Sequence, residues 1–186
     1  MSLAPVLPPA LDPAGWLAGV RRIPSPNCDP RPEDAVVRLL VIHSISLPPG
    51  VFEGDAVIEL FTNQLDWDAH PYYQTIRGAR VSAHFFIRRG GELIQFVPCG
   101  ARAWHAGASC WQGQERCNDF SIGIELEGTD DQPFTDAQYA ALAPLVRLLR
   151  QSYAIEAVVG HSDIAPGRKT DPGPCFAWHR LDERHA

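Results

Sequence analysis

Two histidines and one aspartate are the residues of this chain best suited to hold a metal ion. His43 follows the apolar run VVRLLVI, and the segment GHSDIAPGRKTDPGP (160–174) contains His161 and Asp171. Two neutral imidazoles and one carboxylate form a borderline-soft ligand set that suits zinc. Three protein ligands leave a fourth position open for water, as in catalytic zinc sites. The sequence therefore predicts a zinc-dependent hydrolase.

Each of these residues has a simpler interpretation when it is taken alone. A single histidine at the end of a strand is more often a hydrogen-bonded core or surface residue, and Asp171 before Pro172 is also a common kind of turn residue. Because His43 and His161 occupy equivalent places after apolar runs, a shared metal site explains the three residues together better than three separate roles.

Apolar runs predict the strands that would position these residues. Residues 36–42 and 155–159 are rich in β-branched side chains and predict strands buried on both faces, with His43 and His161 at their ends. Residues 121–127 alternate, which places Glu125 on the face opposite Ile124. Residues 81–88 and 92–97 predict a hairpin around a Gly-Gly turn.

The remaining segments predict helices and loops. Residues 55–63 predict a short helix, and 135–153 predict a long helix opened by the capping pair Thr135 and Gln138. Pro144 inside the long helix predicts a kink or two shorter helices. Prolines predict an irregular segment over 1–35, and 66–78 is expected to be a loop. The order of elements indicates an α/β fold.

Composition limits the classes of protein to which the chain can belong. Its 186 residues, 45% of them hydrophobic, fit a single domain over 1–186, with an irregular extension at 1–15 and a catalytic body at 16–180. The net charge of −6 argues against nucleic-acid binding. No segment reaches the roughly 18 apolar residues that cross a membrane. The N-terminal residues lack the pattern of an export signal, so we expect a cytoplasmic protein. A monomer is expected as well.

Five segments resemble the AmpD-type amidases, which are 1,6-anhydro-N-acetylmuramyl-L-alanine amidases of cytoplasmic peptidoglycan recycling. These segments are VIHSISLPPG (41–50), SAHFFIRR (82–89), RAWHAG (102–107), RCNDFSIGIELEG (116–128) and GHSDIAPGRKTDPGP (160–174). The resemblance implies a central mixed β-sheet flanked by helices, as in the amidase and peptidoglycan-recognition fold. It also implies that anhydromuramyl peptides are the substrates and that the lactyl–L-alanine amide is the bond cut.

The same resemblance implies roles for individual residues. It assigns zinc to His43, His161 and Asp171 and makes Glu125 and Lys169 the catalytic pair. These roles agree with the chemistry, because a glutamate can move the proton of water and a lysine can stabilise a developing oxyanion. Without the resemblance, Glu125 would be read as a solvated strand residue and Lys169 as part of a charged loop.

Substrate contacts are expected from Arg80, Trp104 and Arg116 by the same resemblance. His105 beside Trp104 is a further candidate for the lining of the cleft. His84 is interpreted as a hydrogen-bonded core histidine, with a supporting role near the metal as the alternative. Ser44 stands where relatives usually have asparagine. A contact between a side-chain amide and the substrate is therefore not expected at this position.

Two other functions remain possible from the sequence. A binding-only peptidoglycan-recognition module has the same fold but loses a metal ligand, whereas Asp171 here retains one. A phage-type amidase acting on intact cell wall is the other alternative, although the absence of an export pattern argues against access to the wall.

Overall fold

A six-stranded mixed sheet forms the centre of the computed structural model, which describes residues 10–181. The strand order is β1-β5-β4-β9-β3-β10. These strands are β1 (Arg21–Arg22), β3 (Leu39–Ile45), β4 (Phe85–Ile87), β5 (Leu93–Gln95), β9 (Ser121–Glu127) and β10 (Ala157–Gly160). Strands β10, β3, β9 and β4 are parallel, while β5 is antiparallel to β4 and parallel to β1. The expected mixed α/β fold is confirmed.

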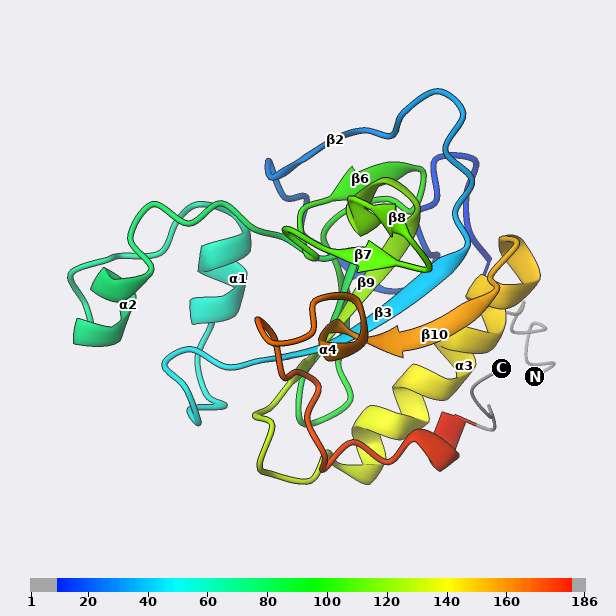
Figure 1. Ribbon diagram of the computed structural model, residues 1–186. Coiled ribbons are helices and arrows are strands. Elements are labelled where there is room, and N and C mark those ends of the chain that lie inside the picture. The colour runs from blue at the N-terminus through cyan, green and yellow to red at the C-terminus, as the bar shows by residue number, and fades with distance from the viewer. Residues whose placement is uncertain (1–9, 182–186) are drawn as a thin grey trace, which may run out of the picture.

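Helices and two small sheets surround this central sheet (Figure 1). The helices are α1 (Ala56–Phe61), α2 (Pro71–Thr75), α3 (Asp136–Ser152) and α4 (His161–Ile164), with 3-10 turns η1 (Cys117–Asp119) and η2 (Trp178–Leu181). The small sheets pair β2 (Cys28–Pro30) with β6 (Ala101–Ala103) and β7 (Cys110–Trp111) with β8 (Gln114–Glu115). Among the described residues, no helix is long and apolar enough to cross a membrane.

The long helix α3 covers one face of the sheet. Its buried side chains pack against Leu40 and Ile42 of β3 and against Ile122, Ile124 and Leu126 of β9. Thr135 and Gln138 form the expected capping box at its start. The helix continues through Pro144, which rules out the alternative of two shorter helices, and the expected kink stays a prediction. Burial of its apolar face offsets the roughly 3 kcal/mol that an internal proline costs.

The opposite face of the sheet carries the residues of interest. Side chains alternate along a strand, so His43 shares this face with Leu39 and Val41 of β3. Glu125 shares it with Ser121 of β9. The register of β3 and β9 pairs His43 directly with Glu125. The expectation that His43 ends its strand is wrong, because pairing with β9 continues to Ile45.

Several short elements differ from the sequence-based expectations. Residues 1–35 were expected to be irregular, but β1 and β2 form there by pairing with β5 and β6. The expected loop at 66–78 contains α2, which His70 caps and Pro71 begins. The hairpin at 81–97 is confirmed in shorter form as β4 and β5. Residues 1–9 of the expected N-terminal extension lie outside the described residues. The bounds 16–180 of the expected catalytic body stay a prediction.

Candidate metal centre and active site

Three potential ligand atoms converge on one point beside β3 and β10. His43 Nδ1 lies 2.9 Å from His161 Nδ1, and Asp171 Oδ2 lies 3.1 Å from each of these nitrogens. Ligand atoms bound at about 2.0–2.1 Å to one tetrahedral zinc ion lie about 3.3 Å apart, which is close to these separations. The described residues thus contain a His–His–Asp cluster that could hold a metal ion.

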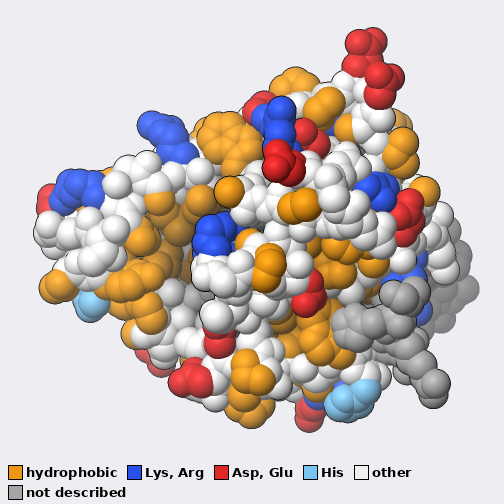
Figure 2. Space-filling model, in the orientation of Figure 1, with side chains coloured by type: hydrophobic (Ala, Val, Ile, Leu, Met, Phe, Trp, Pro, Cys, Tyr) orange, Lys and Arg blue, Asp and Glu red, His pale blue; other side chains and the backbone are white. Residues whose placement is uncertain are grey.

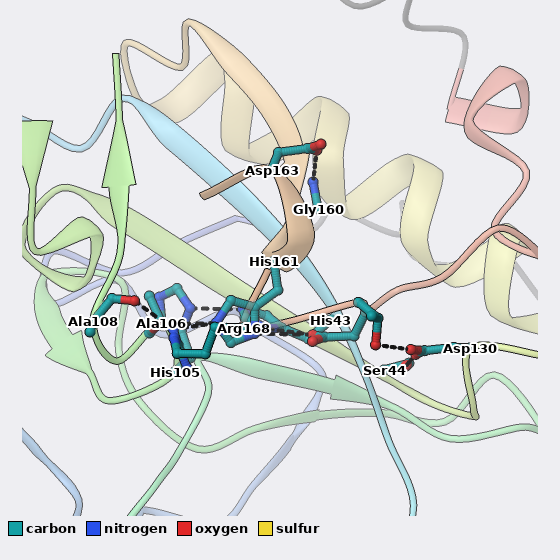
Figure 3. A network of polar contacts seen from close by, with 12 residues as sticks. His43, Ser44, His105, Ala106, Ala108, Asp130, Gly160, His161, Asp163 and Arg168 are labelled. Carbon is teal, nitrogen blue, oxygen red and sulfur yellow. Dashed lines mark hydrogen bonds and ion pairs between the residues drawn. The ribbon is translucent and has the colours of Figure 1, made fainter. Parts of the chain in front are cut away.

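The outer nitrogen of each imidazole also has a partner, which determines how the ring is presented (Figure 3). His43 Nε2 lies 2.9 Å from His105 Nδ1, and His161 Nε2 lies 3.0 Å from the carbonyl oxygen of Ala106. A carbonyl only accepts, so His161 carries its proton on Nε2 and turns the lone pair of Nδ1 toward the cluster. Partners of this kind fix the tautomer of a metal-binding histidine.

The charge states of the cluster suit a cation. Burial lowers the pKa of His43 to about 4, and the neighbouring His161 adds to this effect, so His43 is neutral at pH 7. Burial acts to raise the pKa of Asp171, but the adjacent His161 and His43 outweigh it and hold the pKa below its usual range. A neutral imidazole and an ionised carboxylate are the forms that bind metals.

Glu125 lies beside this cluster with an unsatisfied oxygen. Its side chain is buried, and Oε2 has no hydrogen-bond partner among the described residues. Burial raises the pKa of Glu125 well above its usual value, and Asp171 raises it further, while Lys169 opposes the shift. The interpretation of Glu125 as a solvated strand residue is therefore wrong. A buried carboxylate with a raised pKa is a suitable general base.

A cavity of about 520 Å³ opens onto these residues. Glu125, His161, Lys169 and Asp171 line it on the metal-cluster side. The residues contributed by α1, α2 and the neighbouring segments are mostly apolar, namely Leu47, Pro49, Leu60, Phe61, Ile76, Ala79 and Val81, with Tyr72. Figure 2 shows hydrophobic side chains gathered on the side of the molecule where α1 and α2 lie. The cavity therefore combines a reactive polar wall with an apolar one.

The three expected substrate-binding residues do not line this cavity. Arg80 is exposed, and Trp104 is half-buried with its backbone bonded to Ser82. Arg116 pairs with Asp119 and lines a separate cavity of about 500 Å³. Their roles in substrate binding stay predictions.

Ser44 and Asp130 join the cavity wall in a way that the sequence did not indicate. Ser44 Oγ donates to Asp130 Oδ1 at 3.0 Å, and Thr170 Oγ1 donates to the other carboxylate oxygen. Asp130 therefore connects the strand that carries His43 to the turn that carries Asp171. Figure 3 shows its contact with Ser44. Asp130 lies in the sequence Gly-Thr-Asp (128–130) that follows β9. This short sequence has no periodicity or spacing that would predict a functional site.

Comparison with known proteins agrees with this geometry. The chain matches the N-acetylmuramoyl-L-alanine amidase family model Amidase_2 over residues 33–174. It is 58% identical over 169 residues to the 1,6-anhydro-N-acetylmuramyl-L-alanine amidase AmpD of Escherichia coli K12, covering 90% of this chain and 92% of that protein.

Solved structures give the same result. A crystal structure of a selenomethionine derivative of AmpD superposes with a TM-score of 0.90 at 57% identity, covering 92% of this chain and 97% of that one. AmiD from E. coli, solved in complex with anhydro-N-acetylmuramic acid-L-Ala-D-gamma-Glu-L-Lys, superposes with a TM-score of 0.59 at 32% identity, covering 92% of this chain and 64% of that one. The chain thus belongs to the N-acetylmuramoyl-L-alanine amidase family.

Proposed function

We propose that this protein is a zinc-dependent amidase that hydrolyses the lactyl–L-alanine amide bond of 1,6-anhydro-N-acetylmuramyl peptides in cytoplasmic peptidoglycan recycling. The observation that carries the proposal is the cluster of His43, His161 and Asp171 beside the unpaired Oε2 of Glu125. The high identity to AmpD proteins over nearly the whole chain supports the choice of substrate.

Two imidazoles and one carboxylate suit a borderline metal ion such as zinc better than calcium or magnesium, which prefer oxygen ligands. When bound, zinc supplies Lewis-acid chemistry that polarises an amide carbonyl and makes water a better nucleophile near neutral pH. His43, His161 and Asp171 would hold it.

Glu125 and Lys169 would carry out the proton transfer and the charge stabilisation. Glu125 takes a proton from the attacking water, because its unpaired oxygen is buried and its pKa is raised. The same carboxyl then returns a proton to the leaving amine of L-alanine. Lys169 lines the cavity beside Glu125 and Asp171, where its ammonium can stabilise negative charge that develops on the carbonyl oxygen.

The apolar wall of the cavity supports a preference for the anhydro sugar. The 1,6-anhydro bridge removes the free hydroxyl groups at C1 and C6 of the sugar. A reducing-end sugar facing Leu60, Ile76 and Val81 would leave added hydroxyls without partners, which costs free energy.

Matched substrates that differ only in the sugar test this proposal. We expect kcat/KM for an anhydromuramyl tripeptide to exceed that for the reducing-end muramyl tripeptide by about 10–100-fold, with cleavage between the lactyl group and L-alanine in both. Rates and products are measured by chromatography and mass spectrometry. Equal rates on both substrates, or faster release from intact cell wall, would support a wall-degrading amidase instead.

A further inference from the structure

We propose that His105 is a positioning residue that fixes the tautomer of His43, so that His43 presents the lone pair of Nδ1 to the metal. The inference rests on the proposed zinc function and extends it to a residue outside the ligand set. His105 is 8% exposed, and its ring lies edge-on to that of His43 with the ring centroids 5.0 Å apart.

A short chain of hydrogen bonds links Ser121, His105 and His43 and can hold both rings in the required tautomers. His105 Nε2 lies 3.1 Å from the hydroxyl oxygen of Ser121, to which it can donate a proton. With that proton on Nε2, His105 Nδ1 is an acceptor and receives the Nε2–H of His43 at 2.9 Å. The Nδ1 atom of His43 then carries no proton and faces His161 and Asp171.

The backbone holds His105 in this place. Asn118 Oδ1 accepts the backbone N–H groups of both His105 and Ala106, at 3.1 and 2.8 Å. On its other side the His105 ring lies against Gly123 of β9, where a Cβ atom would come within 2.4 Å of the ring. The imidazole thus has no room to withdraw toward the sheet.

Two neighbouring residues therefore serve the two histidine ligands in different ways. Ala106 accepts from His161 through its backbone carbonyl, which no substitution removes. His105 accepts from His43 through a side chain, so its contribution can be tested by mutation. Without this acceptor, His43 gains by moving its proton to Nδ1, where Asp171 Oδ2 lies 3.1 Å away. That tautomer can no longer bind a metal through Nδ1.

Three variants separate this role from simple packing. His105→Leu removes the acceptor, whereas His105→Asn keeps an oxygen near the place of Nδ1. His84→Leu is the matched control, because the buried His84 ring also contacts His105 but bonds to Gly123 N, Ala101 O and Arg31 rather than to His43. Zinc affinity is measured by competition with a chelator at fixed pH.

We expect His105→Leu to weaken zinc binding by about 10–100-fold, and His105→Asn and His84→Leu to stay within about threefold of the unmodified protein. Nitrogen-15 NMR of the metal-free protein gives a second readout. His43 should be protonated on Nε2 in the unmodified chain and shift toward Nδ1 protonation in His105→Leu.

Each outcome distinguishes this inference from the proposed function. Unchanged zinc affinity in His105→Leu, or equal losses in all three variants, would overturn the role of His105. An Nδ1-protonated His43 in the unmodified, metal-free protein would overturn it even if His105→Leu fails to fold. If the unmodified protein binds no zinc, the proposed function fails, and the NMR measurement still decides the tautomer.

Discussion

Replacement of Glu125 by glutamine is expected to lower kcat by about 10²–10⁴-fold, the range that general acid–base catalysis contributes. Glutamine has nearly the same shape but cannot accept the proton of water. Zinc content and KM should stay close to their original values, because Glu125 is not one of the residues of the metal cluster. Steady-state kinetics on an anhydromuramyl peptide measure kcat and KM, and metal analysis of the same sample measures the zinc content. A variant with full activity would remove Glu125 as the base.

The same substitution should stabilise the metal-free protein, which provides an internal control. Burial raises the pKa of Glu125 in the folded state, so the folded protein favours the neutral carboxyl. The neutral carboxyl of Glu125 contributes fully to stability below the pKa of about 4.3 that glutamate has in the unfolded chain. This contribution is lost as the pH rises through the pKa of Glu125 in the folded protein. Glutamine avoids this loss.

We therefore expect the melting temperature of metal-free Glu125→Gln to be higher than that of the unmodified protein by roughly 2–8 °C at pH 7, and the difference to shrink toward pH 4. Calorimetry at the two pH values measures it. A variant that is both inactive and less stable at pH 7 would indicate a structural defect rather than loss of the base.

Replacement of His161 by alanine is expected to abolish stable metal binding. Only His43 and Asp171 would remain, and loss of one ligand of three should weaken zinc binding on the order of 10³-fold. Elemental analysis after dialysis should find no zinc in this variant, and amide cleavage should be undetectable.

His179→Ala is the matched control, because His179 is exposed and is not part of the metal cluster. It should keep its zinc and its activity. Unchanged zinc content in His161→Ala would remove His161 from the proposed ligand set.

The sequence predicted the elements whose residue pattern is local. The run at 121–127 alternates strictly, and β9 has the same bounds. The side chains of Thr135 and Gln138 themselves form the hydrogen bonds that begin α3, so the capping box was predictable from these two residue types. His43, His161 and Asp171 were predicted from their types and spacing and lie together in the structure.

The features that the sequence did not predict depend on contacts between distant segments. The end of β3 is set by its pairing with β9, not by the apolar run. Glu125 was expected on a polar face, but that face is buried where the segment around His105 covers β9. The link between His105 and His43 joins residues 62 positions apart, and no local pattern marks it.

Zinc-dependent amide cleavage is the central claim, and metal removal and return test it most directly. The protein is stripped with a chelator, titrated with zinc, and assayed for release of the peptide from an anhydromuramyl peptide. We expect no cleavage by the stripped protein and full activity at about one zinc per chain, the stoichiometry of a single three-ligand site. Cleavage by the stripped protein at the original rate, or no activity at any zinc concentration, would contradict zinc-dependent amide cleavage by this protein.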